Sequence, residues 1–246
     1  MLKIDNKGYF KLFILMKNNH KLIIILWAIY FNGFSQTTIT DLSGNIYKTV
    51  KIGSQIWMAE NLRTEKFNNG DPIEIVTSNR YWQEVSLFAM EDTTLEKIWP
   101  VMCYYNNDKL KNNALYNWYV VIDDRNVCPV GWHIPSTQEF EDMIEYLGGI
   151  EKASVKLKST TLWKSVGTNS SGFNAIPIGY RVGSGEFDGK NEETGFWTDD
   201  LVEEINKYNG MKSLMAMVLK INSNNTESEF RKVFFNAPHS VRCIKN

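Results

Sequence analysis

Three cysteines and three histidines are the residues of this sequence that could ligate a metal ion or carry out nucleophilic chemistry: Cys103, Cys128, Cys243, His20, His133 and His239. The cysteines are 25 and 115 residues apart along the chain, and no Cys-x-x-Cys pair is present. A structural zinc site needs four ligands, which usually come from closely spaced pairs. The spacing therefore predicts no metal site.

Catalysis by these residues would need a partner for each of them. A nucleophilic cysteine needs a base beside it, and a general base needs a group that orients it. Cys103 has no histidine near it in the sequence, and His133 has no recognisable Ser or Asp partner. We therefore predict no catalytic residue, with Cys103 as a nucleophile and His133 as a base as the alternatives. For His133, which follows Trp132, a hydrogen-bonded core plug at the start of a helix is the preferred interpretation.

A ligand-binding surface is predicted in the glycine-rich stretch 160–200, and within it on the loop face 179–200. Loops on a rigid scaffold often bind ligands, and glycine lets the backbone approach a ligand closely. The predicted ligand-binding residues are Arg181, Trp197, Asp199 and Asp200. We expect Trp197 at the edge of this face and the fork of Arg181 on a carboxylate, either that of Asp199 or one on a ligand. The alternative is an Arg181–Asp199 pair that only holds the loops in place.

Acidic residues near position 200 could also supply oxygen ligands for calcium. Asp199, Asp200, Glu203 and Glu204 are close in sequence, but their spacing matches no EF-hand. A solvated acidic loop is the simpler interpretation.

Tryptophan is unusually frequent after position 35, where it occurs at positions 57, 82, 99, 118, 132, 163 and 197. Aromatic rings beside amides and carboxylates suit sugar rings, which can stack on the indole. The alternative is a role in the core, and we expect at least five of the seven to be core residues.

The first 35 residues differ in composition from the rest of the chain. Five lysines and one aspartate precede the apolar run 22–31, which at about 1.5 Å per residue is too short to cross a bilayer. Small residues at Gly33 and Ser35 complete the pattern of a signal peptide cut before Gln36. We therefore predict a signal peptide over 1–35, with Met16 as the true start, and no membrane span after cleavage. A buried helix of the domain is the alternative.

Export would place the three cysteines in an oxidising compartment. One disulfide with one thiol left over is then the simple expectation. The net charge of −1 excludes a polybasic nucleic-acid binder.

The elements that must position these residues are predicted from local patterns. Residues 45–58 alternate as a hairpin that turns at Gly53-Ser54, and strands are expected at 195–198, 213–220 and 239–244. The strongest helix signal is 136–147, where Ser136 and Glu139 form a capping box before an apolar face. A weaker helix is expected at 152–157, and the weak pattern over 81–99 predicts an irregular helix followed by a loop. The order predicts one loop-rich α+β domain over 36–246, with short antiparallel sheets and one or two helices.

Ordered motifs along the chain support a family resemblance. The most specific is Cys-Pro-Val-Gly-Trp-His-Ile-Pro-Ser at 128–136, and others lie at 41–53, 57–62, 104–107, 115–119, 156–160, 172–175, 179–181 and 240–243. With these motifs the chain resembles the Fibrobacter succinogenes major paralogous domain, a family of exported bacterial modules. The segment 195–200 and a long stretch at 83–100 depart from the usual family pattern.

The resemblance implies a fold similar to C-type lectin-like domains and to formylglycine-generating enzymes. In lectin-like folds the last strand returns beside the first, so the resemblance implies a disulfide between Cys128 and Cys243. Three free buried thiols are the alternative. A bridge closing a loop of this length would stabilise the fold by about 4–5 kcal/mol in the chain-entropy model.

The functional expectation is a secreted or cell-surface module that binds a glycan or a surface protein, without catalysis, cofactor or nucleic acid. An enzyme on a formylglycine-generating scaffold and a purely structural surface domain are the alternatives. A pocket holding Cys103 or His133 beside another titratable group would favour the enzyme. An exposed tryptophan would favour glycan binding.

Overall fold

The computed structural model describes residues 3–4, 10–11, 37–91, 98–109, 113–205, 212–223 and 228–246. By its contacts the chain divides into Met1–Ser35 and Gln36–Asn246. In the first unit, β1 (Lys3–Ile4) pairs with β2 (Phe10–Lys11). The apolar run 22–31, Met16 and the predicted cleavage point lie outside the described residues, so the signal peptide stays a prediction.

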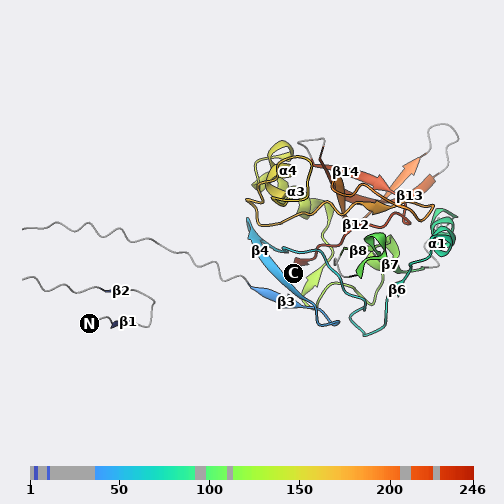
Figure 1. Ribbon diagram of the computed structural model, residues 1–246, viewed down its shortest axis with the longest axis horizontal. Helices are drawn as coiled ribbons and strands as arrows, with labels where there is room; N and C mark the ends of the chain where they lie inside the picture. Colours follow the sequence, from blue (N-terminus) through green and yellow to red (C-terminus); the bar gives the residue numbers. More distant parts are fainter. Residues whose placement is uncertain are drawn as a thin grey trace, which may run out of the picture. The chain divides into compact units, whose positions relative to one another are not determined.

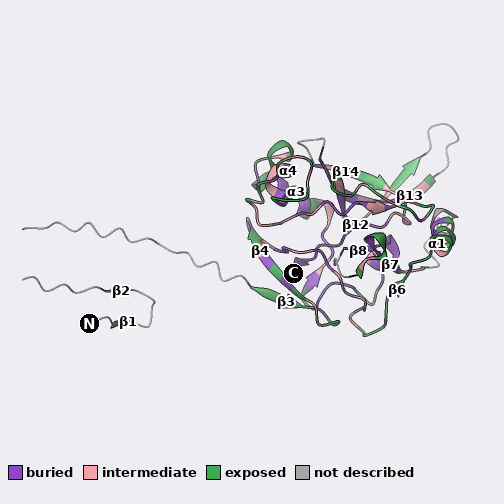
Figure 2. Cartoon of the chain, in the orientation of Figure 1, coloured by how far each residue is buried: buried purple, intermediate pink, exposed green. Residues whose placement is uncertain are grey.

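A five-stranded sheet joins the two ends of the second unit (Figure 1). Its strand order is β3 (Thr38–Thr40), β4 (Ile46–Ile52), β5 (Gln55–Met58), β15 (Ile244–Lys245) and β9 (Trp132–His133). The predicted hairpin 45–58 is confirmed as β4 and β5, which turn at Gly53 with a φ of +62°. Buried and exposed residues alternate along the first half of β4 (Figure 2). The period of two explains why this hairpin is legible in the sequence.

A second sheet consists of β12 (Glu193–Ile205), β13 (Lys212–Asn222) and β14 (Ser228–Val233), all antiparallel. The predicted strand at 195–198 is the first part of β12, whose register shifts between Trp197 and Leu201. β14 is absent from the sequence-based prediction. The strand expected at 239–244 is reduced to β15 and to single bridges at His239 and Ser240.

Smaller sheets complete the strand inventory of the described residues. β6 (Glu74–Ile75) pairs in parallel with β7 (Val101–Tyr104), which pairs antiparallel with β8 (Ala114–Tyr116). The hairpin of β10 (Tyr180–Arg181) and β11 (Phe187–Asp188) lies in the predicted loop face. Mixed helices and mostly antiparallel sheets agree with the predicted α+β class.

The described residues contain four α-helices, so the expectation of one or two helices is wrong. They are α1 (Asn79–Glu91), α2 (Trp118–Val121), α3 (Thr137–Tyr146) and α4 (Ile150–Leu157), with a 3-10 turn, η1 (Tyr105–Asn107). The capping box of α3 is confirmed, because Ser136 accepts from the Glu139 N–H and Glu139 accepts from the Ser136 N–H. α1 overlaps the stretch 81–99, where the sequence predicts an irregular helix followed by a loop, and Ser78 Oγ accepts from the Tyr81 N–H at its start. α2 escapes the prediction because its four residues carry no capping or charge signal.

The disulfide between Cys128 and Cys243 is confirmed, with 5.9 Å between the two Cα atoms. It fastens the segment that leads into β9 to the segment that leads into β15. Cys103 is a buried free thiol. Among the described residues, no helix has the length and apolarity that a membrane crossing requires.

Candidate functional site

Arg181 is buried, with 1% of its surface exposed, and its fork does not meet a carboxylate. Its Nε donates to the Gly185 carbonyl, and its terminal nitrogens donate to the Val76 and Thr77 carbonyls and to Asn79 Oδ1. The guanidinium also lies over the rings of Trp82 and Phe187, at 4.7 and 4.8 Å. The expected Arg181–Asp199 pair is therefore wrong, since carbonyl and amide oxygens take its donors.

Trp197 is fully buried, so its expected place at the edge of the loop face is also wrong. Its Nε1 donates to the Tyr116 carbonyl at 2.7 Å, and its ring contacts Trp118 and His239. The neighbouring β12 residues 194–198 are also buried. Trp197 therefore serves as a large apolar side chain of the core and not as a ligand contact at the surface.

Asp199 and Asp200 lie near the N-terminus of α3 and not beside Arg181. Asp199 is exposed, and its backbone N–H donates to the Pro135 carbonyl. The Asp200 carboxylate is half-buried and accepts from the Thr137 N–H in the first turn of α3. Partial desolvation and the charge of Asp200 raise the pKa of Asp199. Within the described part of the chain, no group of three or more His, Cys, Asp or Glu residues is arranged to hold a metal ion.

Cys103 and His133, the two alternatives for catalysis, have different environments: the Cys103 thiol is buried, and both ring nitrogens of His133 are hydrogen-bonded. Burial raises the pKa of the Cys103 thiol to about 12, although Arg181 lowers it in part. His133 uses Nε2 toward both oxygens of Glu139 and Nδ1 toward Asn246 Oδ1, at 2.7–3.2 Å. The hydrogen bonds of the expected plug beside the start of α3 are confirmed, but its place in the core is wrong, because the His133 side chain is 38% exposed.

Five of the seven tryptophans are buried, as expected: Trp57, Trp82, Trp118, Trp132 and Trp197. Trp99 and Trp163 are half-buried and present part of their rings at the surface. Trp163 donates Nε1 to the Ala175 carbonyl and lies beside the Lys158 ammonium. Trp99 has a different environment, with a surface carboxylate.

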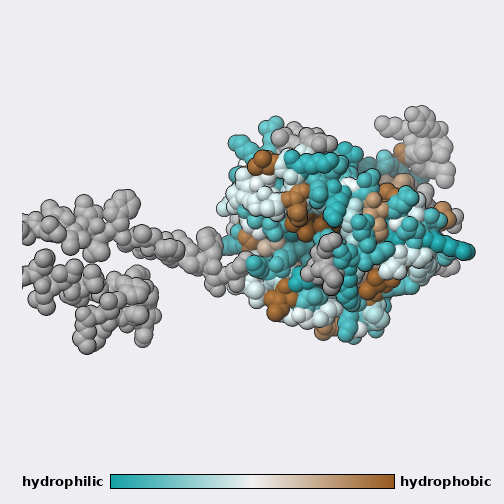
Figure 3. Space-filling model, viewed as in Figure 1, coloured by the Kyte–Doolittle hydropathy of each residue, from teal (hydrophilic) through white to brown (hydrophobic). Residues whose placement is uncertain are grey.

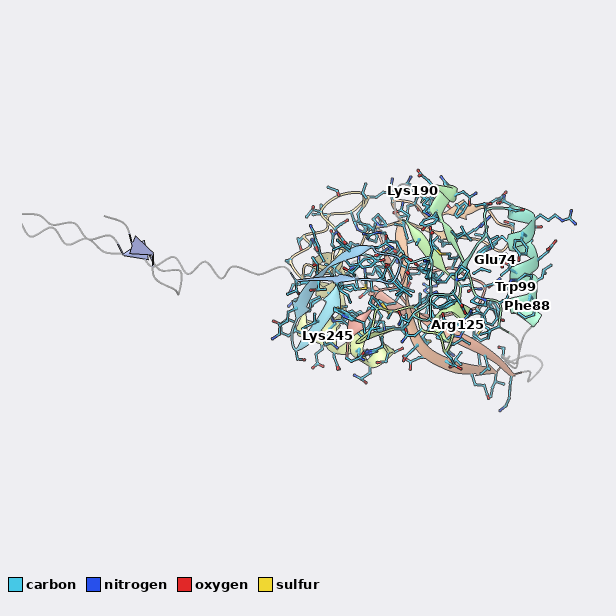
Figure 4. All side chains as sticks on the ribbon, turned by 90° about the horizontal axis from the view of Figure 1, so that it is seen from below. Glu74, Phe88, Trp99, Arg125, Lys190 and Lys245 are labelled. Atoms are coloured by element: carbon cyan, nitrogen blue, oxygen red, sulfur yellow. A yellow bond between two sulfur atoms is a disulfide. The ribbon has the colours of Figure 1, made fainter. Side chains whose placement is uncertain are left out.

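Trp99, Tyr81, Phe88 and Glu74 form a surface group that we call the Trp99 platform. The Tyr81 hydroxyl donates to Glu74 Oε1 at 2.8 Å, and Trp99 Nε1 donates to Glu74 Oε2 at 3.3 Å. The Trp99 ring meets Tyr81 and Phe88 edge-on, with centroids 5.6 and 5.5 Å away. Figure 4 shows Glu74, Trp99 and Phe88 close together beside α1.

Burial and the acceptor Glu74 raise the pKa of Tyr81, so its hydroxyl stays a donor at neutral pH. The exposed side chains of Ile75, Leu87 and Ile98 come from the same segments as the platform. On the face drawn in Figure 3, hydrophobic residues lie in small separate groups among hydrophilic ones. The platform combines aromatic surface with a fixed carboxylate, a combination that suits a ligand with both apolar faces and hydroxyl groups.

Arg181 positions this platform although it is not part of it. Its bonds to the Val76 and Thr77 carbonyls and to Asn79 hold the segment between Glu74 and Tyr81. The same side chain holds the loop 182–186 through Gly185. Among the predicted binding residues, Arg181 therefore connects the predicted loop face to the platform.

Glu74 and Tyr81 are missing from the sequence-based prediction. Their relation to Trp99 depends on the pairing of β6 with β7, which brings together residues 25 positions apart. The only local signal for this surface is the tryptophan at position 99 itself.

Comparison with known families supports the resemblance in the sequence. The family model of the Fibrobacter succinogenes major domain matches residues 50–245. No curated protein and no solved structure gives a significant match.

Proposed function

Because the chain belongs to the Fibrobacter succinogenes major domain family, we propose that it is an exported, non-catalytic binding module that contacts a glycan through the Trp99 platform. In this proposal residues 1–35 are a signal peptide, and the mature domain is secreted or held at the cell surface. The domain has a lectin-like arrangement. A protein partner at the same surface is the variant of this proposal that the experiment below separates.

The observation that carries the proposal is the half-exposed indole of Trp99 with its N–H held by a surface carboxylate. Because Glu74 accepts from both Tyr81 and Trp99, the rings are fixed before a ligand arrives. Fixed aromatic side chains lose little conformational entropy on binding, which favours affinity. Each Glu74 oxygen also keeps lone-pair capacity for a ligand hydroxyl.

Two further observations support the non-catalytic part of the proposal. The thiol of Cys103 is buried and its pKa is raised, which disfavours the thiolate that a nucleophile needs. Both ring nitrogens of His133 already face oxygen acceptors.

The confirmed disulfide supports export, because such bridges persist in oxidising compartments.

The test is a glycan array probed with the 36–246 protein, with and without calcium, followed by titration of any glycan that binds. We expect Trp99→Ala to weaken binding about tenfold or more, since buried aromatic contacts dominate such interfaces. Trp163→Ala is the matched control, because Trp163 is also half-buried and hydrogen-bonded but lies outside the platform. Equal losses in the two variants, or full binding by Trp99→Ala, would contradict the proposal. An array without hits, together with a protein partner lost in Trp99→Ala, would identify a protein-binding surface.

A further inference from the structure

Two buried polar groups on α1 lack hydrogen-bond partners among the described residues: Trp82 Nε1 and Ser86 Oγ. Trp82 is 0% exposed and Ser86 is 3% exposed. A buried donor without a partner destabilises the fold, and a phenylalanine and an alanine at these positions would avoid that cost. Groups of this kind in a native structure call for an explanation, such as a ligand or a second state.

These two residues lie on one face of α1, because positions four apart are neighbours on a helix. The loop 182–186 covers that face. A Cβ placed on Gly183 would be 3.9 Å from Ser86 Cβ and 4.0 Å from Ser86 Oγ. The Arg181 guanidinium, which anchors the loop, lies 4.7 Å from the centre of the Trp82 ring.

The electrostatics beneath this loop favour an anion. Trp82 N–H is a donor only, and the Ser86 hydroxyl can donate. Among the described residues, Arg181 bonds to carbonyl and amide oxygens and to the Cys103 thiol, and none of these groups is charged. Burial accordingly lowers the pKa of Arg181. A buried cation is normally accompanied by an opposite charge, which a ligand carboxylate would supply.

Among the described residues, two side-chain hydrogen bonds attach the loop to the rest of the domain. Gly185 accepts from Arg181 Nε, and the Ser184 carbonyl accepts from Gln83 Nε2 on α1. Gly183, Ser184 and Glu186 are exposed. Gly185 has a φ of +94° and packs closely on the Asn79 backbone, so few other residues could replace it in this turn.

We propose that the loop 182–186 is a lid over an anion subsite formed by Trp82 Nε1 and Ser86 Oγ beside Arg181, and that this subsite takes the carboxylate of an acidic saccharide. The proposal rests on glycan binding at the Trp99 platform, which is built on the same helix. The platform contacts the sugar ring, and the subsite selects for the acidic group. Opening the lid breaks the Gln83–Ser184 bond and gives the carboxylate access to the two donors.

The lid is tested without any ligand by the exchange of indole N–H protons, followed by NMR. Trp118 is the internal control, because it is also fully buried and its Nε1 is also unpartnered among the described residues. We expect the Trp82 indole to exchange at least tenfold faster than the Trp118 indole, and faster still in Gln83→Ala. If the Trp82 and Trp118 indole protons exchange equally slowly, the loop 182–186 does not open and is not a lid.

The subsite is tested with trigalacturonate as the acidic probe and maltotriose as the neutral one. We expect Ser86→Ala to raise the melting temperature, because it removes an unsatisfied hydroxyl, and to weaken trigalacturonate binding about tenfold. Ser154→Ala is the matched control, since Ser154 Oγ on α4 is also buried and unpartnered. It should raise the melting temperature and leave binding unchanged.

The indole signals separate this inference from the proposed function. If maltotriose or trigalacturonate shifts the NMR signal of the Trp99 indole but not that of the Trp82 indole, the subsite is overturned and the platform is retained. Saccharides that shift neither indole would overturn the platform and the acidic class together. A response of Trp82 to triglutamate but not to trigalacturonate would assign the subsite to an acidic peptide and overturn the saccharide.

Discussion

Arg242 and Arg181 are both buried arginines whose donors go to backbone carbonyls and amide oxygens, yet they belong to different regions. Arg242 is fully enclosed next to Cys243, and it donates to Asn61 Oδ1 and to the carbonyls of Met58, Phe173 and Asn174. These partners are 68 to 184 residues away along the chain. Arg181 instead holds a surface loop and the segment that carries the Trp99 platform.

The difference shows that a buried arginine marks a convergence of chain segments and does not by itself mark a binding site. Around Arg242 the segments are the end of β5, the turn at 173–174 and the segment that leads into the last strand. We call this buried region the framework. Around Arg181 one of the segments is a loop with exposed residues, and two buried donors on the helix below it have no partner among the described residues. The same chemistry therefore stabilises the core in one place and orders a surface in the other.

The largest effect is expected from Arg242→Ala. The change leaves several buried oxygens without donors, at about 1–3 kcal/mol each, and it opens a cavity beside Phe173 and Phe196. The sum approaches the total stability of a domain, so the variant should fail to fold or unfold at very low urea. Circular dichroism in a urea series measures this. Arg231→Ala, at an exposed ion pair with Glu229, is the control and should change little. A urea midpoint near that of the wild type would remove Arg242 from the framework.

The second effect is the loss of the disulfide in the Cys128→Ser, Cys243→Ser double variant. The bridge spans 115 residues and restricts the unfolded chain, so its loss should destabilise the fold. We expect about 3–4 kcal/mol, below the chain-entropy value, because residual structure in the unfolded chain reduces the effect. The free energy of unfolding of this variant should match that of the reduced wild-type protein. If reductant leaves the wild-type urea midpoint unchanged, the bridge does not stabilise this region.

A pH effect of intermediate size is expected from His239, which lies in the same framework region against Trp197. Burial, with a smaller effect of Lys220, lowers the pKa of His239 to about 3. The unfolded chain binds this proton near pH 6.5, so stability is complete above that pH and falls toward pH 3 by about 1.4 kcal/mol per unit. In His239→Leu the urea midpoint should change less between pH 6 and pH 4 than it does in the wild type. An unchanged slope in this variant would show that other groups cause the acid sensitivity.

The smallest effect on stability, and the one that separates the two regions best, is expected from Arg181→Lys. A lysine ammonium cannot reproduce the fork, so we expect a loss of about 1–2 kcal/mol and a clear loss of glycan binding at the platform. Arg63→Lys is the control, since Arg63 also donates to a carbonyl and lies over a tyrosine ring. It should cost a similar amount of stability and keep binding. Full binding by Arg181→Lys would show that the platform does not depend on the Arg181 anchor.

Local patterns were sufficient for several elements of this fold. The hairpin 45–58, the Ser136–Glu139 capping box and the predominance of core tryptophans follow from residues that are close in sequence. β14 was missed because its six residues show no clear alternation, and its strand conformation depends on pairing with β13. The short helix α2 was missed because nothing in its four residues marks a helix start.

The candidate site divides in the same way. Arg181 was identified, but its partners Val76 and Thr77 are 105 and 104 residues away and could not be inferred from spacing. Trp197 was expected at the edge of the glycine-rich loop face 179–200, whereas β12 turns its ring into the core. Glu74 and Tyr81 carried no signal on their own.

The sequence alone therefore determines the family, the main hairpin and the capped helix, since each depends on short-range periodicity or on ordered motifs. The pairing of Cys128 with Cys243 was expected from the family resemblance. Which polar groups meet which partners was determined by the tertiary packing. Hydrogen bonds act over about 3 Å. Whether Arg181 meets Asp199 or the Val76 carbonyl, and whether Trp99 or Trp197 reaches the surface, thus depends on how distant segments come together.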